Sequence, residues 1–176
     1  WLPRVFGGLE LSPLDFVDVV EAAAELDGTV GWLVGNGGGM SRAGGYLPAD
    51  VATKWFANPR AFVVASNGAL GTATPAAGGY RVTGRWPFGS GIHHASHVMV
   101  TCALTAKDAS QPPKTIACYF PRADVNIIDN WHVSGLRGTG SCDFEAKDVF
   151  VPETQAHPYP EHVPTQPGIV YRLQAF

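Results

Sequence analysis

Apolar and polar positions recur with helical spacing in the first part of the chain, between Ser12 and Gly28. Ser12 is a favourable N-cap, Pro13 occupies the first helical position, and Gly28 follows the end of the pattern, which together predict one helix. The polar positions form a single stripe and the remaining apolar arc is wide, so we expect this helix to be mostly buried. The stripe consists of Asp15, Asp18, Glu21 and Glu25.

Two more helices are expected before residue 60. One begins near Thr29 and runs toward the glycines at 37–39, which are poor helix formers, and the other covers 48–57 and is stopped by Asn58-Pro59. The glycine-rich segment 35–39 has the composition of a nucleotide-binding loop. Such a loop needs a preceding strand and a following helix, and neither is predicted here, so a flexible or close-packed turn is favoured.

At residue 60 the period of the pattern changes from helical to two. Residues 80–86 alternate apolar and polar side chains, and Ala77-Gly78-Gly79 joins them to the preceding strand in a hairpin. The other expected strands are rich in β-branched residues. They cover 70–76, 98–104, 115–120, 125–129 and 142–151.

This order of elements predicts an α+β fold, because the helices come first and the strands follow. We expect an N-terminal helical segment at 1–59, a middle antiparallel β domain at 60–152, and a connector at 153–176 that is rich in Pro and His and has no periodicity.

Composition narrows the functional classes. Charged residues make up 15% of the 176 residues and the net charge is −3, against a usual charged share of about 25%. No basic block is present to bind nucleic acid, and no apolar run is long enough to span a membrane. Three separated cysteines indicate neither disulfides nor a zinc site, and a cytoplasmic location is expected.

The histidines at 93, 94 and 97 raise the question of a metal site. Their segment is predicted as turn and strand, where a spacing of four residues separates side chains by roughly 13 Å. No carboxylate or Cys lies nearby in the sequence to complete a ligand set. Turn and surface histidines are therefore favoured over a metal site.

The segment 86–91 is the candidate with the most specific chemistry. The strand ends in Trp86 and Phe88, and the turn Gly89-Ser90-Gly91 presents one hydroxyl. Aromatic rings beside a small polar group suit an aromatic ligand that has one hydrogen-bonding edge. The same pair of aromatic residues is also typical of a strand that ends in the core.

Two longer motifs add a resemblance. Residues 78–91 (GGYRVTGRWPFGSG) and residues 131–141 (WHVSGLRGTGS), followed by DVFVP at 148–152, resemble the middle β domain of the acyl-CoA dehydrogenase superfamily. Within it the chain is similar to the group D branch, the oxygenase components of two-component flavin-dependent monooxygenases. The dehydrogenase branch has a Thr-Glu pair ahead of the hairpin, where this chain has GTATP at 71–75.

The resemblance implies that the protein uses reduced flavin (FMN or FAD) and O₂. A separate NAD(P)H-dependent flavin reductase would supply the flavin, and a C4a-hydroperoxyflavin would hydroxylate an aromatic, phenol-like substrate. It also implies a barrel-like β domain, a homotetramer, and a C-terminal helical bundle that is absent from these residues. The alternatives are an acyl-CoA dehydrogenase-like flavoprotein and a non-catalytic binding domain.

The same resemblance assigns the site residues. Ser90 is expected to act catalytically, with its hydroxyl against flavin N5. The flavin pocket would comprise Trp86, Phe88, Gly89, Ser90 and Gly91. Trp32 and Ser66 would contact the substrate, although Met40 stands in the region where some phenol hydroxylases have a histidine. No metal is expected.

Overall fold

Three α-helices open the chain in the computed structural model, which describes residues 1–105, 114–160 and 163–173. They are α1 (Pro13–Leu26), α2 (Gly28–Met40) and α3 (Ala49–Phe56). The Ser12 hydroxyl caps α1 by accepting a hydrogen bond from the Asp15 backbone N–H at 3.2 Å. The Asp27 carboxylate caps α2 by accepting from Thr29 N–H at 2.7 Å. The predicted helices and the cap at Ser12 are therefore confirmed.

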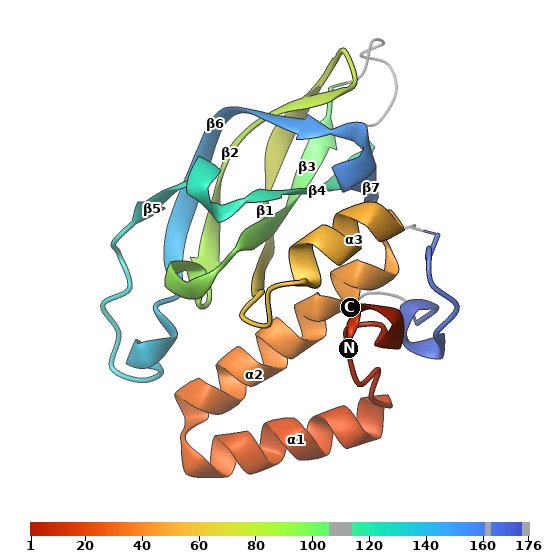
Figure 1. Cartoon of the computed structure of the whole chain (residues 1–176). Helices are drawn as coiled ribbons and strands as arrows, with labels where there is room; N and C mark the ends of the chain where they lie inside the picture. The colour runs from red at the N-terminus through yellow and green to blue at the C-terminus, as the bar shows by residue number, and fades with distance from the viewer. Residues whose placement is uncertain (106–113, 161–162, 174–176) are drawn as a thin grey trace.

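Seven strands form one sheet in the order β5-β6-β2-β1-β3-β4-β7. Figure 1 shows the helices beneath and in front of this sheet, with α2 between α1 and the strands. The α+β class with helices first is confirmed. The strands are β1 (Val63–Ala76), β2 (Gly79–Gly89), β3 (His97–Leu104), β4 (Thr115–Pro121), β5 (Asn126–Ile128), β6 (Cys142–Pro152) and β7 (Ala156–Pro158).

The sheet is mixed, which corrects the expectation of an antiparallel β domain. β1 and β2 form the predicted hairpin, but β3 then returns beside β1 and runs parallel to it. A short 3-10 turn at Ile92–His94 lies in the connection from β2 to β3. The order of strands ends at β5 and β7, and in the described residues these two edges do not pair. The expected barrel-like closure is therefore not seen.

The connector predicted from residue 153 contains one of these edge strands. β7 pairs with β4 through contacts such as Ala117 with His157, so the sheet continues past residue 152. Residues 161–162 and 174–176 of the connector lie outside the described residues. The domain boundaries at 59 and 152 remain predictions.

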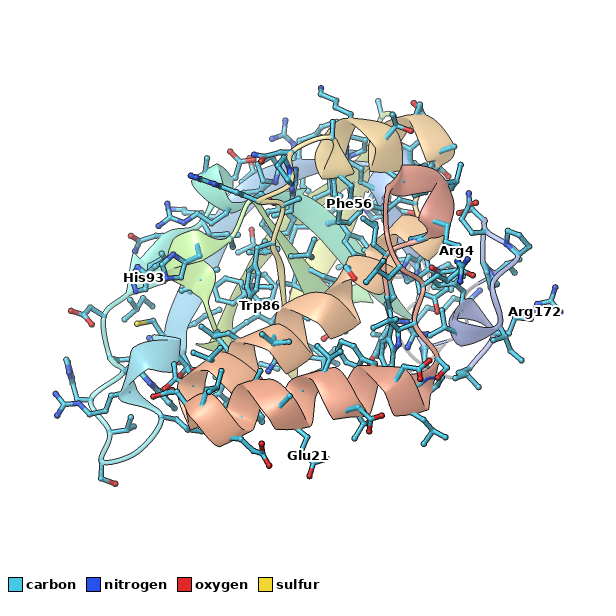
Figure 2. All side chains as sticks on the ribbon, turned by 60° about the horizontal axis from the view of Figure 1, so that its bottom comes forward. Arg4, Glu21, Phe56, Trp86, His93 and Arg172 are labelled. Carbon is cyan, nitrogen blue, oxygen red and sulfur yellow. The ribbon has the colours of Figure 1, made fainter. Side chains whose placement is uncertain are left out.

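The core around Trp86 (Figure 2) is built from side chains of β1, β2, β3, β4 and β6, together with Ile92. The Trp86 ring is fully buried, stacks on Phe144 with 5.7 Å between ring centroids, and donates from Nε1 to the Thr101 carbonyl at 3.1 Å. The three cysteines are free and buried, so they pack as small apolar side chains, as expected.

The prediction that α1 is mostly buried is wrong. None of its residues is buried, and Leu14 is 79% exposed. In the described residues its main packing partner is α2, so most of its apolar arc faces solvent. Periodicity marks an apolar face but does not supply the element that covers it.

The glycine-rich segment is part of a helix, which corrects the expectation of a turn. α2 continues through residues 37–39 to Met40. A Cβ at Gly37 would lie 2.2 Å from the Phe62 ring, and one at Gly38 would lie 2.6 Å from the Phe16 ring. The glycines therefore let the helix approach neighbouring rings, and this packing outweighs their low helix propensity.

Candidate functional site

The turn after β2 changes the direction of its last side chains. Trp86 and Phe88 would share one face of a regular strand, yet Trp86 is fully buried and Phe88 is 64% exposed. Phe88 has a φ of 58°, and the register between β2 and β6 shifts between Trp86 and Gly89. A phenylalanine in the left-handed region costs roughly 1–3 kcal/mol, and such strain concentrates at functional sites.

Ser90 follows this kink and joins two segments that are distant in sequence. Its Oγ accepts a hydrogen bond from Trp32 Nε1 at 2.9 Å. It also lies 2.8 Å from Ser141 Oγ, which in turn lies 2.7 Å from Thr139 Oγ1. Thr139 Oγ1 donates to the Leu136 carbonyl at 2.8 Å. Four side chains from α2, the Ser90 turn and the 136–141 loop therefore form one hydrogen-bonded chain.

The carbonyl at the end fixes the direction of every proton in this chain. A carbonyl only accepts, so the Thr139 proton points to Leu136, and Thr139 Oγ1 must accept from Ser141. The Ser141 proton is then used, so Ser141 must accept from Ser90. Ser90 Oγ thus accepts from Trp32 and donates to Ser141, and one of its lone pairs has no partner among the described residues.

Large exposed apolar side chains lie on the segments next to the Ser90 turn, whereas Ser90 itself is only 9% exposed. Trp32 is 50% exposed. Phe88 meets the Trp131 ring edge to face, with 6.2 Å between centroids, and Trp131 Nε1 donates to the Leu136 carbonyl at 3.1 Å. Leu136 is also exposed. Exposed apolar groups beside one polar atom are typical of a binding surface.

The remaining predicted flavin-pocket residues are interior. The structure places Trp86 in the core, and Gly89 and Gly91 are buried as well. A Cβ at Gly89 would lie 2.8 Å from the Phe144 ring, and Gly91 has a φ of +78°. Gly89 is needed because there is no room for a side chain, and Gly91 because its φ is positive. Trp86 lies in the core just before the turn.

Ser66 lies on β1 and is buried. Its hydroxyl donates to the Pro87 carbonyl at 2.6 Å, so it fixes the strand just before Phe88. The side chains that precede and follow it, Ala65 and Asn67, line a cavity instead. The structure therefore brings Trp32 to Ser90 but assigns the Ser66 hydroxyl an internal bond.

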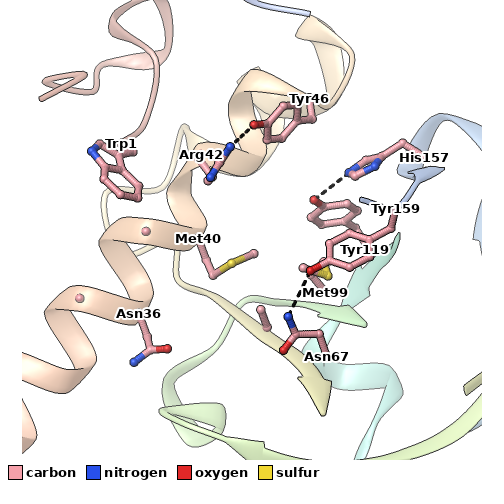
Figure 3. Close-up of a pocket in the computed structure, with 13 residues that line it drawn as sticks. Trp1, Asn36, Met40, Arg42, Tyr46, Asn67, Met99, Tyr119, His157 and Tyr159 are labelled. Atoms are coloured by element: carbon pink, nitrogen blue, oxygen red, sulfur yellow. Dashed lines mark hydrogen bonds between the residues drawn. The ribbon is translucent and has the colours of Figure 1, made fainter. Parts of the chain in front are cut away.

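That cavity has a volume of about 350 Å³ and lies between α2, the start of η2 (Ser41–Gly45) and the strands β1, β3 and β4 (Figure 3). Such a volume is at the lower end of the range for small-molecule sites. Its lining combines apolar side chains with phenol, guanidinium, imidazole and amide groups. The lining includes Met40, Met99, Arg42, Tyr119, His157 and Tyr159.

The polar groups of the cavity are ordered by hydrogen bonds. His157 Nδ1 lies 2.8 Å from the Pro158 carbonyl and must donate to it, so in the neutral ring Nε2 accepts from Tyr119 Oη at 3.0 Å. Asn67 Nδ2 donates to Tyr159 Oη at 3.2 Å, and Arg42 donates to Tyr46 Oη. Burial raises the pKa of Tyr119, so its phenol remains protonated.

One helix connects the cavity to the Ser90 turn. Asn36 lines the cavity, and its Nδ2 donates to the Trp32 carbonyl at 2.8 Å. Residues 32, 36 and 40 occupy successive turns on one side of α2, so this face runs from Ser90 to the cavity.

The histidines considered for metal binding are in different environments. His97 stacks on Trp55 with 3.7 Å between centroids, and burial lowers its pKa to about 4. His93 Nε2 lies 3.7 Å from Cys142 Sγ. Within residues 1–105, 114–160 and 163–173, no three His, Cys, Asp or Glu side chains gather as a metal site. No helix in these ranges has the length and hydropathy of a membrane span.

Solved structures share the fold of this chain. No family model matches the chain. XiaF of Streptomyces sp., solved with FADH₂ and glycerol, is 30% identical, with a TM-score of 0.82 over 90% of this chain and 40% of its own. The HsaA monooxygenase of Mycobacterium tuberculosis is 29% identical, with a TM-score of 0.83 over 90% of this chain and 43% of its own.

Curated sequences agree with these structures. The pigment production hydroxylase of Rhodococcus erythropolis is 34% identical over 155 residues, 86% of this chain and 39% of its own length. The oxygenase component of the FADH₂-dependent resorcinol hydroxylase of Rhizobium sp. is 32% identical over 163 residues. The chain is thus related to the oxygenase components of flavin-dependent monooxygenases, which confirms the resemblance. It spans about two fifths of the length of these relatives.

Sequence reasoning missed the inner part of the hydroxyl chain and the polar lining of the cavity. The segment 131–141 entered the sequence analysis only as a motif of the resemblance, although Thr139 and Ser141 alternate with its glycines. Two hydroxyl side chains that alternate with glycines were the available signal. Nothing in the sequence placed Tyr119 beside His157, because they lie on strands 38 residues apart.

Proposed function

We propose that the protein is, or forms part of, the oxygenase component of a two-component flavin-dependent monooxygenase that hydroxylates an aromatic substrate. The observation that supports this most is the similarity to such oxygenase components over 85–90% of the chain. The geometry at Ser90 agrees with it.

The residues around Ser90 fit a flavin ring. The Ser90 hydroxyl keeps a free acceptor lone pair and bonds the half-exposed Trp32, and the exposed Phe88 precedes it by two residues. This combination matches a flat apolar ring system with an N–H on its edge. Trp32 and Phe88 would contact the ring faces or rim, Ser90 would contact N5, and Trp86 would hold the turn in place. The bound flavin supplies oxygen activation, and the protein orients it and excludes water.

The cavity beside Met40 is the proposed place for the aromatic substrate. It lies one helical turn beyond Trp32 on the same face of α2. Its apolar floor suits a ring, and Tyr119, Tyr159 and Arg42 offer polar contacts for hydroxyl or carbonyl substituents. Substrate contact is therefore proposed for Trp32 and for these cavity residues. We also propose that a separate NAD(P)H-dependent reductase delivers the reduced flavin and that the whole protein is a homotetramer.

Oxygen-isotope incorporation tests this function. The protein is mixed with resorcinol or indole-3-acetate, ¹⁸O₂, NADH, FMN or FAD, and a flavin reductase. We expect a hydroxylated product that contains one ¹⁸O atom. Exclusive formation of hydrogen peroxide with every phenol and indole tried would contradict the proposal, and anaerobic bleaching of bound flavin by an acyl-CoA would favour a dehydrogenase.

A Ser90→Ala variant localises the chemistry. It removes the proposed contact with N5, so the peroxide released per NADH consumed should rise. Thr53→Ala is the matched control, because it removes an exposed hydroxyl on α3 that bonds only the Ala49 carbonyl. Equal peroxide release by both variants would remove Ser90 from its role.

A further inference from the structure

Two buried side chains behind Ser90, Ser141 and Thr139, determine where the Ser90 hydroxyl proton points. The Thr139 and Ser141 side chains are only 1% and 4% exposed, so water does not compete for their hydroxyls. The Leu136 carbonyl that ends the chain is itself held by Trp131 Nε1 at 3.1 Å. The order Trp32, Ser90, Ser141, Thr139, Leu136 is therefore directional.

The backbone keeps these hydroxyls at hydrogen-bonding distance. Gly91 N–H donates to the Thr139 carbonyl at 2.8 Å, which ties the Ser90 turn to the 136–141 loop. Gly138 packs against Thr29 of α2, where a Cβ would lie 2.9 Å from the Thr29 side chain. The 136–141 loop is thus held to the Ser90 turn by a backbone hydrogen bond and to α2 by close packing.

We propose that Thr139 and Ser141 are positioning residues that hold Ser90 as a hydrogen-bond acceptor toward its ligand. With its proton committed to Ser141, Ser90 can accept an N–H but cannot donate to a bare ring nitrogen. Reduced flavin carries a hydrogen on N5, whereas oxidised flavin presents N5 as an acceptor. The site therefore selects the reduced form through two buried hydroxyls. This inference rests on the proposed flavin site.

Removing one hydroxyl should reverse the chain. In Thr139→Val the shape is kept, but Ser141 loses its acceptor and turns its proton to Ser90. Ser90 then accepts from both Trp32 and Ser141, and its own proton is free to donate to the ligand. Ser141→Ala frees the same proton directly. Thr139→Ser keeps the hydroxyl and is the matched control.

Anaerobic titrations with reduced and with oxidised FMN measure the effect. The quantity of interest is the affinity for reduced FMN divided by the affinity for oxidised FMN. We expect this ratio to fall about tenfold in Thr139→Val and Ser141→Ala, as for one hydrogen bond gained or lost. In Thr139→Ser it should stay within about twofold of the wild-type ratio. A merely structural role would weaken both forms equally and leave the ratio unchanged. That result would overturn the proposal.

A second measurement follows the proton direction without flavin. In protein labelled with ¹⁵N-tryptophan, the indole proton of Trp32 reports its hydrogen bond to Ser90. Ser90 accepts more strongly while it donates to Ser141, so the resonance should move upfield in Thr139→Val and not in Thr139→Ser. An unmoved resonance contradicts the directional chain. If wild-type protein binds neither flavin form, the proposed function and the flavin selection fail together, and a shifted resonance would still establish the chain.

Discussion

The sheet core and the α1–α2 hairpin are both rich in apolar side chains, but they differ in what covers them. Around Trp86 the strands bury large rings and branched side chains, such as Phe120, Phe144 and Val100. Along α1 the apolar arc contacts α2 on one side and solvent on the other, and Glu21 points away from the molecule (Figure 2). Burial therefore depends on the neighbouring element, and apolar pattern alone does not determine it.

The largest expected effect is in the sheet core. Trp86→Ala removes a fully buried ring that stacks on Phe144 and fills the space left by Gly71, where a Cβ would lie 2.3 Å from the indole. We expect a loss of about 3–5 kcal/mol in the free energy of unfolding, measured by urea denaturation.

Trp86→Phe is the graded control. It keeps an aromatic ring but leaves the Thr101 carbonyl without the indole N–H that it accepts. The loss should be smaller, about 1–3 kcal/mol. A loss below about 1 kcal/mol in Trp86→Ala would mean that the core relaxes around the missing ring, and the contrast with α1 would disappear.

The sequence was sufficient where local chemistry decides the structure. The cap at Ser12, the hairpin at 77–79 and the strand from Cys142 to Pro152 follow from residue preferences and period. It was insufficient where distant segments decide. The parallel pairing of β1 with β3 and the helical glycines at 37–39 depend on partners such as Phe62.

The candidate site divides in the same way. The motif at 86–91 located Ser90, and the resemblance assigned Trp32 to the substrate. The hydrogen bond between the two side chains was found only in the structure. The prediction assumed that Trp86 and Phe88 lie on the same face of the strand. The positive φ of Phe88 interrupts this alternation, so Phe88 is exposed while Trp86 remains in the core. The buried hydroxyls and the Tyr119–His157 pair needed three-dimensional contacts.

An intermediate effect is expected where the hairpin is tightly packed. Gly31 of α2 approaches α1 so closely that a Cβ would lie 2.7 Å from the Ala24 Cα. Gly31→Ala should therefore destabilise the protein by about 1–3 kcal/mol, because backbone must move. Alanine normally stabilises a helix relative to glycine by about 1 kcal/mol.

Gly39→Ala is the matched substitution in the same helix. The nearest atom to its Cβ would be 4.0 Å away, on Trp1, so the gain in helix propensity should remain, up to about 1 kcal/mol. Thermal unfolding of the two variants should give opposite shifts. Stabilisation of both variants would show that α1 moves freely against α2, and the hairpin would then be less tightly packed than its geometry indicates.

The smallest effect is expected on the outer face of α1. Leu14→Gln replaces an exposed side chain by one of similar helix propensity, so the free energy of unfolding should change by less than about 0.5 kcal/mol. The same substitution at Leu47, which is buried against α3 and the sheet, should cost several times more, because an amide would be buried without a partner. Urea denaturation at several protein concentrations distinguishes the outcomes. A loss above about 1 kcal/mol at Leu14 that grows with concentration would mean that a second copy of the chain covers α1.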